Sequence, residues 1–321
     1  MKHQDLIDTL LALVRKQDGN LKFQRQFTHI VKQQANLQYR IEAQIAPYLK
    51  KYTGDYAQNF RHYRISSENK VLTDLVDSNV AYVGDFHPLN EAKEVLHTLL
   101  QQLLKQGRKI TLAMELVRAE HQKFLDRYIK GELTELGFLQ KIDYWKDWRG
   151  IPWDYYKPIF NLAKANRRRI KIVGIDSSHD GYSCHLRDYH AAKTISRAVM
   201  EQPDRIVVAC MGDLHVAKQH FPEKAGQQID SLGGKNKSVI IYQNRSSLYW
   251  ELMEAKQLCK GTNVVQLSRS QNCAEYCILS ASPVDKCISY INAGLYWFSK
   301  PEETVKNIHD AVVETLKHSN I

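Results

Sequence analysis

The residues best suited to chemistry in this sequence are two histidines that end the same four-residue motif. Residues 84–87 read Gly-Asp-Phe-His, and residues 212–215 read Gly-Asp-Leu-His. Each motif follows an apolar run with β-branched residues and precedes a helix-like segment, which is the pattern of a strand, a tight turn and a helix start. The glycine permits a sharp turn, so each histidine is expected at its mouth. A single Gly-x-x-His match would be a weak signal, but two with the same aspartate indicate a shared site.

A glutamate, Glu115, follows the apolar run 110–114 in the same way, and Asp176 ends the run that starts at residue 170. The predicted strands cover residues 80–84, 109–115, 170–176, 205–212 and 238–242. Helical patterns lie between them at 89–105, 119–129, 155–166 and 186–200. This alternation predicts parallel βαβ units, in which ligands bind outside the carboxyl ends of the strands. The polar residues at the strand ends should therefore gather at one edge of the sheet.

The alternating strand and helix patterns predict an α/β fold with a mainly parallel central sheet flanked by helices. Residues 1–77 are predicted to form a helical N-terminal extension, with helices near 4–16, 20–47 and 69–77 and a turn at 53–55. Residues 78–321 are predicted to form the α/β domain. Further strands are expected at 264–267 and 275–279, and a final helix at 301–317, where Pro301 suits the first turn.

Two imidazoles and a carboxylate at converging strand ends could hold a borderline transition metal. His87, His215 and Glu115 would be its ligands, with positions left open for water or substrate. Asp85 and Asp213 could then accept hydrogen bonds that orient the imidazoles. Such a metal would lower the pKa of bound water and polarise a carbonyl, which is hydrolytic chemistry. Without a metal, Glu115 near a histidine could act as a general base on water.

Structural roles stay open for the same residue types. A histidine after a strand is commonly a turn or capping residue, and Glu115 could simply pair with an arginine such as Arg118. Asp176 and His179 could line the same pocket, or they could have no part in it. The aromatic segment 144–156 is either a lid over an apolar ligand or core packing. Tyr155 and Tyr156 within it offer phenolate oxygens, which can ligate ferric haem.

The composition is that of a globular protein: 43% of the 321 residues are hydrophobic and 25% are charged. A net charge of +10 favours anionic partners. No nucleic-acid-binding module is recognisable, however, and a solvated basic face is the simpler explanation of the charge. Six cysteines without a CxxC spacing indicate reduced thiols. No Gly-x-Ser-x-Gly elbow, Walker loop or His-Glu-x-x-His motif is present, which weakens the serine hydrolase, P-loop and zincin classes.

No apolar run approaches the roughly 20 residues that span a bilayer, so no transmembrane segment is expected. Asp5 and Asp8 interrupt any signal-peptide core, and no small-residue cleavage site or lipid-modifiable cysteine follows. A cytoplasmic location is therefore expected, and a peripheral or periplasmic one only if an upstream segment is missing.

Four segments together resemble the ChaN-like family of the Tiki/TraB/erythromycin-esterase superfamily. They are 83–87 (Val-Gly-Asp-Phe-His), 113–115 (Ala-Met-Glu), 153–158 (Trp-Asp-Tyr-Tyr-Lys-Pro) and 211–215 (Met-Gly-Asp-Leu-His). The shared mark of that superfamily is two Gly-x-x-His motifs with a glutamate between them. The resemblance covers roughly residues 78 to 225. This chain has Gly-Asp-x-His where many relatives have Gly-Glu-x-His, and it lacks the signal peptide and lipobox of the lipoproteins.

The resemblance implies more than one possible function, because the branches of the superfamily differ in activity. ChaN-like members are haem-binding iron-uptake lipoproteins, Tiki members are metal-dependent proteases, and erythromycin esterases hydrolyse a lactone. In each case the resemblance carries the site onto His87, Glu115 and His215. The expected function is therefore a ChaN-like haem- or iron-binding protein; the alternatives are a metal-dependent hydrolase of peptide or ester bonds and a scaffold with a vestigial site.

The expected cofactor is haem or a divalent transition metal (iron, manganese, cobalt or zinc), and the expected partner is a small-molecule ligand or haem, with a homodimer left open. The residues predicted to be catalytic or to ligate a metal are His87, Glu115 and His215. The residues predicted to contact the cofactor are Gly84, Asp85, Gly212, Asp213, Asp176, Trp153 and Tyr156.

Overall fold

The structure is a computed structural model that describes residues 3–41, 46–177, 183–294 and 300–318. Its centre is an eight-stranded sheet in the order β1-β7-β8-β6-β2-β5-β3-β4. The strands from β8 to β4 pair in parallel, whereas β7 pairs antiparallel with β8 and β1 antiparallel with β7. The strands are β1 Arg64–Ser66, β2 Val80–Asp85, β3 Lys109–Arg118, β4 Ile170–Asp176, β5 Arg205–Gly212, β6 Ser238–Gln243, β7 Asn263–Arg269 and β8 Cys273–Leu279. The predicted mainly parallel α/β fold is confirmed.

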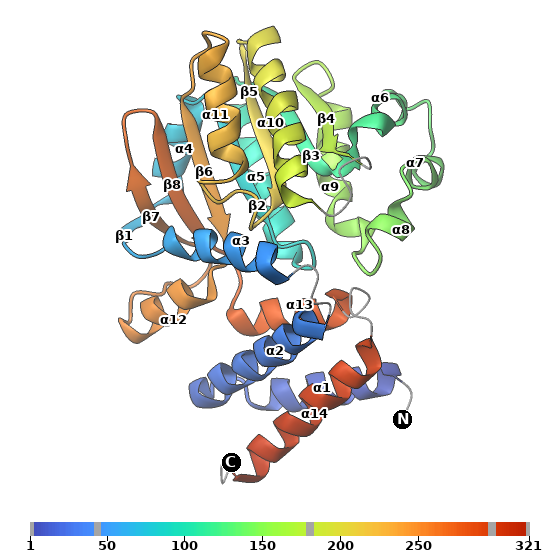
Figure 1. Ribbon diagram of the computed structural model, residues 1–321, viewed down its shortest axis with the longest axis vertical. Coiled ribbons are helices and arrows are strands. Elements are labelled where there is room, and N and C mark those ends of the chain that lie inside the picture. The colour runs from blue at the N-terminus through green and yellow to red at the C-terminus, as the bar shows by residue number, and fades with distance from the viewer. Residues whose placement is uncertain (1–2, 42–45, 178–182, 295–299, 319–321) are drawn as a thin grey trace.

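Helices cover both faces of the sheet (Figure 1). One face packs against α4 (Glu68–Val76), α5 (Asn90–Lys105) and α9 (Lys157–Ala165). The other packs against α10 (Cys184–Glu201) and α11 (Phe221–Ser231). Because both faces are covered, β2, β5 and β6 are buried along nearly their whole length, and their sequences are apolar throughout rather than alternating.

The two Gly-Asp-x-His motifs lie side by side because their strands are neighbours. β2 pairs in parallel with β5, and in this register Asp85 is opposite Gly212. β3 lies on the other side of β5 and pairs with it as far as Met114, so Glu115 comes directly after the last residue paired with β5. β3 itself continues to Arg118, three residues beyond the predicted end at 115. The strand order thus places both motifs and the glutamate at one edge of the sheet, because the carboxyl ends of parallel strands all lie at the same edge.

The chain between β3 and β4 makes a long excursion at the side of the sheet. It contains α6 (Gln122–Lys130), α7 (Glu135–Lys141), α8 (Tyr144–Asp147) and short 3₁₀ turns at Ala119–His121 and Trp153–Tyr155. This excursion carries the aromatic segment 144–156 close to the end of β2, where it meets the first motif.

A helical lobe, formed by α1, α2, α13 and α14, lies below the carboxyl edge of the sheet in Figure 1. Its helices are α1 His3–Lys16, α2 Leu21–Ile41, α13 Pro283–Gly294 and α14 Pro301–His318, and their apolar stripes share a core with Leu10, Phe27, Ile291 and Val312. The two ends of the chain therefore pack together. Between this lobe and the sheet lie α3 (Ala46–Gln58) and α12 (Ser246–Glu254).

Two local predictions for the N-terminal part are wrong. The expected turn at 53–55 lies inside α3, and Arg64–Ser66 forms an unpredicted strand that pairs with β7. A glycine in a helix costs about 1 kcal/mol, but Tyr52 and Tyr56 are both buried by the continued helix, which outweighs that cost. The boundary between residues 77 and 78 stays a prediction.

No helix within the described ranges is both long and apolar enough to cross a bilayer.

Candidate functional site

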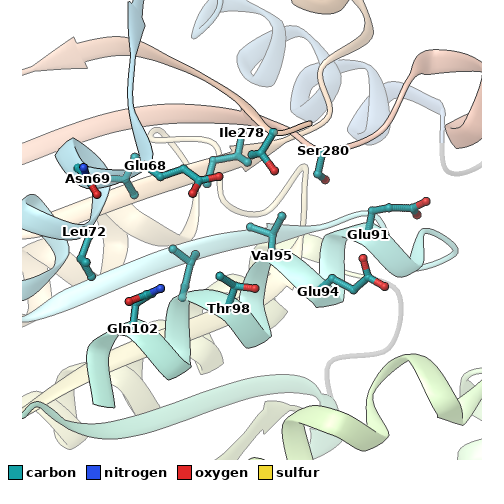
Figure 2. A pocket seen from close by; sticks show the side chains of 13 residues that line it. Glu68, Asn69, Leu72, Glu91, Glu94, Val95, Thr98, Gln102, Ile278 and Ser280 are labelled. Atoms are coloured by element: carbon teal, nitrogen blue, oxygen red, sulfur yellow. The ribbon is translucent and has the colours of Figure 1, made fainter. Parts of the chain in front are cut away.

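A cavity of about 300 Å³ between α4, α5 and β8 holds none of the predicted site residues. Figure 2 shows that Glu68, Glu91 and Glu94 surround it. The predicted site lies elsewhere, at the carboxyl ends of β2, β3 and β5.

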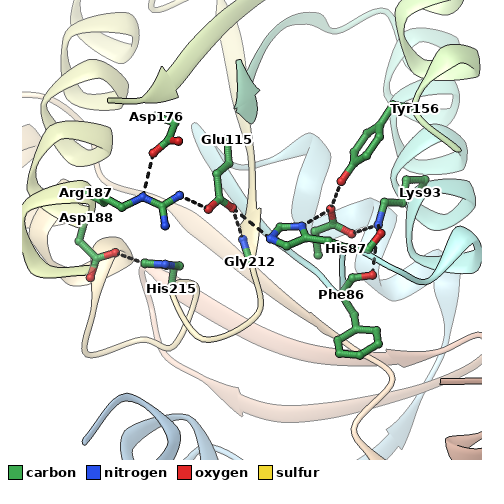
Figure 3. A network of polar contacts seen from close by, with 11 residues as sticks. Phe86, His87, Lys93, Glu115, Tyr156, Asp176, Arg187, Asp188, Gly212 and His215 are labelled. Carbon is green, nitrogen blue, oxygen red and sulfur yellow. Dashed lines mark hydrogen bonds and ion pairs between the residues drawn. The ribbon is translucent and has the colours of Figure 1, made fainter. Parts of the chain in front are cut away.

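The predicted site residues meet around Gly212, the last residue of β5. A Cβ atom placed on Gly212 would lie 3.3 Å from His87 Nε2, 3.6 Å from Glu115 Oε2 and 3.6 Å from His215 Cδ2. The glycine thus keeps a small space open between the three side chains. Figure 3 shows the two imidazoles on either side of Glu115 and Gly212. The structure therefore brings together the three residues that the strand-end pattern singled out.

His87 is held by a buried network on its Nδ1 side. Nδ1 lies 2.9 Å from Asp85 Oδ2, and the Tyr156 hydroxyl donates to the same oxygen at 2.6 Å. Lys93 Nζ donates to Asp85 Oδ1 at 2.5 Å and to the His87 carbonyl at 2.6 Å. Although burial alone would raise it, Lys93 and His87 hold the pKa of Asp85 well below its usual range. Asp85 therefore accepts from the imidazole as predicted, and His87 Nε2 is left to face Glu115.

His215 is oriented by Asp188 rather than by Asp213. Its Nδ1 lies 2.6 Å from Asp188 Oδ1, and the Tyr52 hydroxyl of α3 donates to Asp188 Oδ2 at 2.5 Å. The Cys184 side chain also hydrogen-bonds to the imidazole. Burial lowers the pKa of His215, but these hydrogen bonds and the charge of Asp188 outweigh burial and raise it to about 10. The imidazole is thus protonated at neutral pH.

Glu115 is buried between cations and accepts from both neighbouring elements. The Gly212 N–H donates to Oε2 at 2.6 Å, Arg187 pairs with Oε1, and His87 Nε2 lies 3.7 Å from Oε2. Burial raises the pKa of Glu115, but Arg187, His87 and His215 together lower it to about 2. The arginine that pairs with Glu115 is Arg187; Arg118, the partner considered from the sequence, instead pairs with Asp147 at 2.6 Å.

Asp176 and Asp213 lie at the rim of this arrangement. Arg187 Nε donates to Asp176 Oδ1 at 2.8 Å, so one guanidinium bridges Asp176 and Glu115. Asp213 lies 3.7 Å from Lys286 Nζ, and among the described residues the carboxylate that holds His215 Nδ1 is that of Asp188. Asp213 packs instead against Gly84, where a Cβ would clash with Asp213 Oδ1. The predicted orienting role of Asp213 is therefore taken by Asp188, and Gly84 makes room for the second motif. His179 lies outside the described residues.

The predicted metal site is not supported. In the part of the chain that the structure describes, no three His, Cys, Asp or Glu side chains are grouped so that they could hold a metal ion. The physical reason is that the candidate ligands already have partners: Glu115 is paired with Arg187, and a protonated His215 has no lone pair to give. The residues do not fit a three-ligand metal centre.

The aromatic segment 144–156 contributes side chains both to the hydrophobic core and to the lining of a cavity. Trp153 packs against Phe160 with ring centroids 4.9 Å apart, whereas Trp148 meets the His87 ring edge-on at 4.8 Å. Both tryptophans line a cavity of about 570 Å³ that also includes Trp145 and Asn292. Tyr156 is buried, and burial together with Asp85 raises its pKa well above the ordinary value, so it is a hydroxyl donor and not a free phenolate. Tyr155 is half-buried beside it.

Sequence reasoning missed four residues of the site: Lys93, Arg187, Asp188 and Cys184. Cys184, Arg187 and Asp188 lie in the first turns of α10, and the latter two follow Cys184 by three and four residues, so all three share one helix face. Ser183 caps this helix by accepting a hydrogen bond from the Leu186 N–H. That spacing was a usable signal. Lys93 is only 2% exposed, and nothing in its local sequence marks a buried lysine.

Comparison with known proteins agrees with the resemblance. Residues 71–180 match the family model described as haem-binding uptake, Tiki superfamily, ChaN. No protein of curated function matches the chain. Among solved structures, ChaN of Campylobacter jejuni with cofacially bound haem is 14% identical and has a TM-score of 0.42, the match covering 68% of this chain and 93% of that one.

Two toxin-related structures are similar to the same degree. The type III effector HopBA1 is 12% identical with a TM-score of 0.47, covering 69% of this chain and 97% of that one. The C-terminal region of the Pasteurella multocida toxin is 15% identical with a TM-score of 0.36, covering 47% and 21%. The family match includes His87 and Glu115 and ends before His215. Over residues 71–180, which is less than half of its length, this chain is thus similar to the haem-binding uptake family ChaN of the Tiki superfamily.

Proposed function

We propose that this protein binds haem at the carboxyl edge of the sheet, with His87 as the ligating side chain. The observation that carries the proposal is the environment of His87. Its Nδ1 is held by the buried carboxylate of Asp85, which fixes the ring so that Nε2 would be the atom that coordinates an iron, and this is how ligating histidines are ordinarily oriented. The family match over residues 71–180, which contains His87, supports the same ligand.

The cavity beside His87 suits a flat apolar ligand. Its volume of about 570 Å³ lies within the range of small-molecule sites, and Trp148 joins it to the imidazole. The indole Nε1 of Trp153 is buried there without a hydrogen-bond partner among the described residues, so it is a donor that a carboxylate of a bound ligand could use. The bound iron would supply redox or ligand-binding chemistry, while this chain would orient the imidazole and exclude water.

Hemin titration of the purified protein tests this proposal. The wild-type protein should give a saturable shift of the Soret band, and His87→Ala should weaken it by at least about tenfold because the iron loses its nitrogen ligand. His62→Ala, which removes an exposed histidine in the turn before β1, is the matched control and should bind hemin as the wild type does. A shift that His87→Ala leaves intact, or that His62→Ala weakens equally, would show non-specific binding and reject His87 as the ligand.

A second candidate function is hydrolysis of an ester or peptide bond, as in other branches of the superfamily. It is favoured by the short distance of 3.7 Å between His87 Nε2 and Glu115 Oε2 and by the carboxylate behind each imidazole. Asp85 would hold His87 so that Nε2 takes a proton from water, and the water oxygen would attack the carbonyl. The tetrahedral intermediate would then break the ester C–O or peptide C–N bond, and His87 would return the proton to the leaving alcohol or amine. The cations Arg187 and His215 would stabilise the negative oxygen that forms. With a pKa of about 2, Glu115 is a weak base and would orient the water.

This hydrolase candidate predicts turnover of some member of an ester or peptide library that survives chelation by EDTA. Glu115→Gln should lower the rate by about 10²-fold or more, since it removes the charge between the two imidazoles. Because Glu115 is buried, the folded state of the variant must be checked by circular dichroism, and His87→Gln serves as a second variant. Activity that is lost with EDTA and restored by a metal would instead support the metal-dependent alternative. A scaffold with a vestigial site predicts neither haem binding nor turnover; a cytoplasmic location and a homodimer stay predictions.

A further inference from the structure

A further cavity, of about 570 Å³, lies where the helical lobe meets the sheet. It is open to solvent and is lined by one face of α2, by α13 and by the first turn of α12, with Phe86 from the turn after β2 also in its wall. It contains none of the residues that hold His87 or His215. Its volume is that of a small-molecule site.

The charged groups in this cavity are cationic. Arg25 and Lys32 stand two helical turns apart on α2. Lys286 lines the cavity from α13, and its Nζ also lies 3.7 Å from Asp213. No aspartate or glutamate is among the described residues that line the cavity. Arg25 pairs with Glu254 at 2.5 Å, but both side chains are largely exposed, so this pair competes weakly with a bound anion. The lining therefore favours a negatively charged ligand.

The first turn of α12 adds donors at the same place. Ser246 and Ser247 begin this nine-residue helix and line the cavity, and no side chain caps the helix at Arg245. Backbone N–H groups in a first helical turn have no intrahelical partner, and the helix dipole favours negative charge there. Together with the nearby lysines, this is an arrangement that suits a phosphate group.

The remaining wall of the cavity is aromatic. Trp250 lies on α12 with the Arg25 guanidinium 5.2 Å from its ring centroid, and the Phe86 and Tyr290 rings lie 6.1 Å apart. Lys286 Nζ lies 4.2 Å from the centre of the Phe86 ring. Aromatic side chains next to cations bind a flat ring by stacking, which a simple inorganic anion cannot use.

We propose that this cavity binds an organic phosphate that carries an aromatic ring, of the nucleotide class. The cations and the helix terminus would hold the phosphate, and the aromatic wall would hold the ring. The cavity in Figure 2 has the opposite character, since its charged lining residues are glutamates. The proposed nucleotide site shares no lining residue with the cavity beside Trp148, so its test does not require haem.

A fluorescence titration of the full chain with trinitrophenyl-ATP tests this inference, with ATP, adenosine and tripolyphosphate as competitors. Saturable binding is expected, with ATP competing at least about tenfold better than adenosine or tripolyphosphate, because only ATP uses both walls. Lys32→Glu and Trp250→Ala should each weaken binding by about tenfold. Lys22→Glu makes the same charge change at an exposed position of α2 outside the cavity and should bind as the wild type does.

Several outcomes would overturn the inference. They are the absence of saturable binding, equal weakening by Lys22→Glu and Lys32→Glu, and competition by tripolyphosphate as strong as that by ATP. The second would indicate general attraction to a basic surface, and the third a simple anion site. Lys32 is exposed, so its variant should keep the wild-type circular dichroism spectrum and a loss of binding can be assigned to the cavity.

Discussion

Among the residues of the site, Asp85 has the most completely used side chain. One carboxylate oxygen accepts from Lys93, and the other accepts from Tyr156 and lies at hydrogen-bonding distance from His87. Because Lys93 and His87 depress its pKa in the folded state, Asp85 stabilises the fold above its unfolded pKa of about 3.9, and this contribution is lost as the pH falls toward the folded value. Asp85 therefore stays ionised across the neutral range and can hold His87 in one orientation.

Lys93→Met is expected to lower the free energy of unfolding by about 3–5 kcal/mol at pH 7, because it leaves the buried Asp85 charge without its cation. The loss should shrink below about pH 4, where the wild-type protein also loses the contribution of the ionised carboxylate. Urea denaturation at several pH values measures this. The control is Lys109→Met, which removes an exposed pair with Asp204 and should cost less than about 1 kcal/mol. Equal losses in the two variants would contradict a structural role for the buried pair.

At the scale of elements, one helix and one segment outside the sheet complete the site. The first turns of α10 supply Arg187 to Glu115 and Asp188 to His215, so the orientation of this helix links the two strand ends. α3 then covers Asp188 through Tyr52, whose ring also lies 5.8 Å from His215. A segment that the sequence reading placed in a separate extension thus contacts the site directly.

Tyr52→Phe should lower the free energy of unfolding by about 1.5–3 kcal/mol, since it removes a hydrogen bond to a buried carboxylate. Tyr189→Phe on α10 is the matched control, because this tyrosine is 55% exposed, and its effect should stay within about 0.5 kcal/mol. Thermal or urea unfolding distinguishes the two variants. If both have the same stability as the wild type, α3 is not held to the site by this hydrogen bond.

At the scale of the whole molecule, the site lies between the sheet and the segments that enter from both ends of the chain. The helical lobe joins residues near the N-terminus to α13 and α14, and α3 and α12 fill the space between this lobe and the carboxyl edge of the sheet (Figure 1). The two cavities of about 570 Å³ lie on this side of the molecule, one beside Trp148 and the other beside Trp250. Each of the two cavities is thus lined in part by α13, a helix of the lobe in which the chain ends pack.

Local sequence determined the elements that carry the site. The predicted strands at 170–176 and 205–212 agree with β4 and β5 to the residue. β5 is apolar along nearly its whole length because it is buried on both faces, whereas β4 lies at the end of the sheet and has an exposed Lys171. A polar residue that ends such a run must lie at the carboxyl edge of a parallel sheet, which is why His87, Glu115 and His215 could be singled out and do meet at Gly212. These inferences depend only on residue type and spacing.

The tertiary structure alone decided which partners these residues have. Asp213 stands two residues from His215, as Asp85 does from His87, yet the carboxylate that reaches His215 is Asp188 from a crossover helix. That helix is α10, and its position depends on its packing against the sheet and α11. This packing consists of many contacts between residues that are distant in the sequence. Tyr52 reaches Asp188 for the same reason, because the burial of α3 outweighs a glycine that locally predicts a turn. Strand ends follow from local pattern, whereas the charge state of the site follows from packing between distant segments.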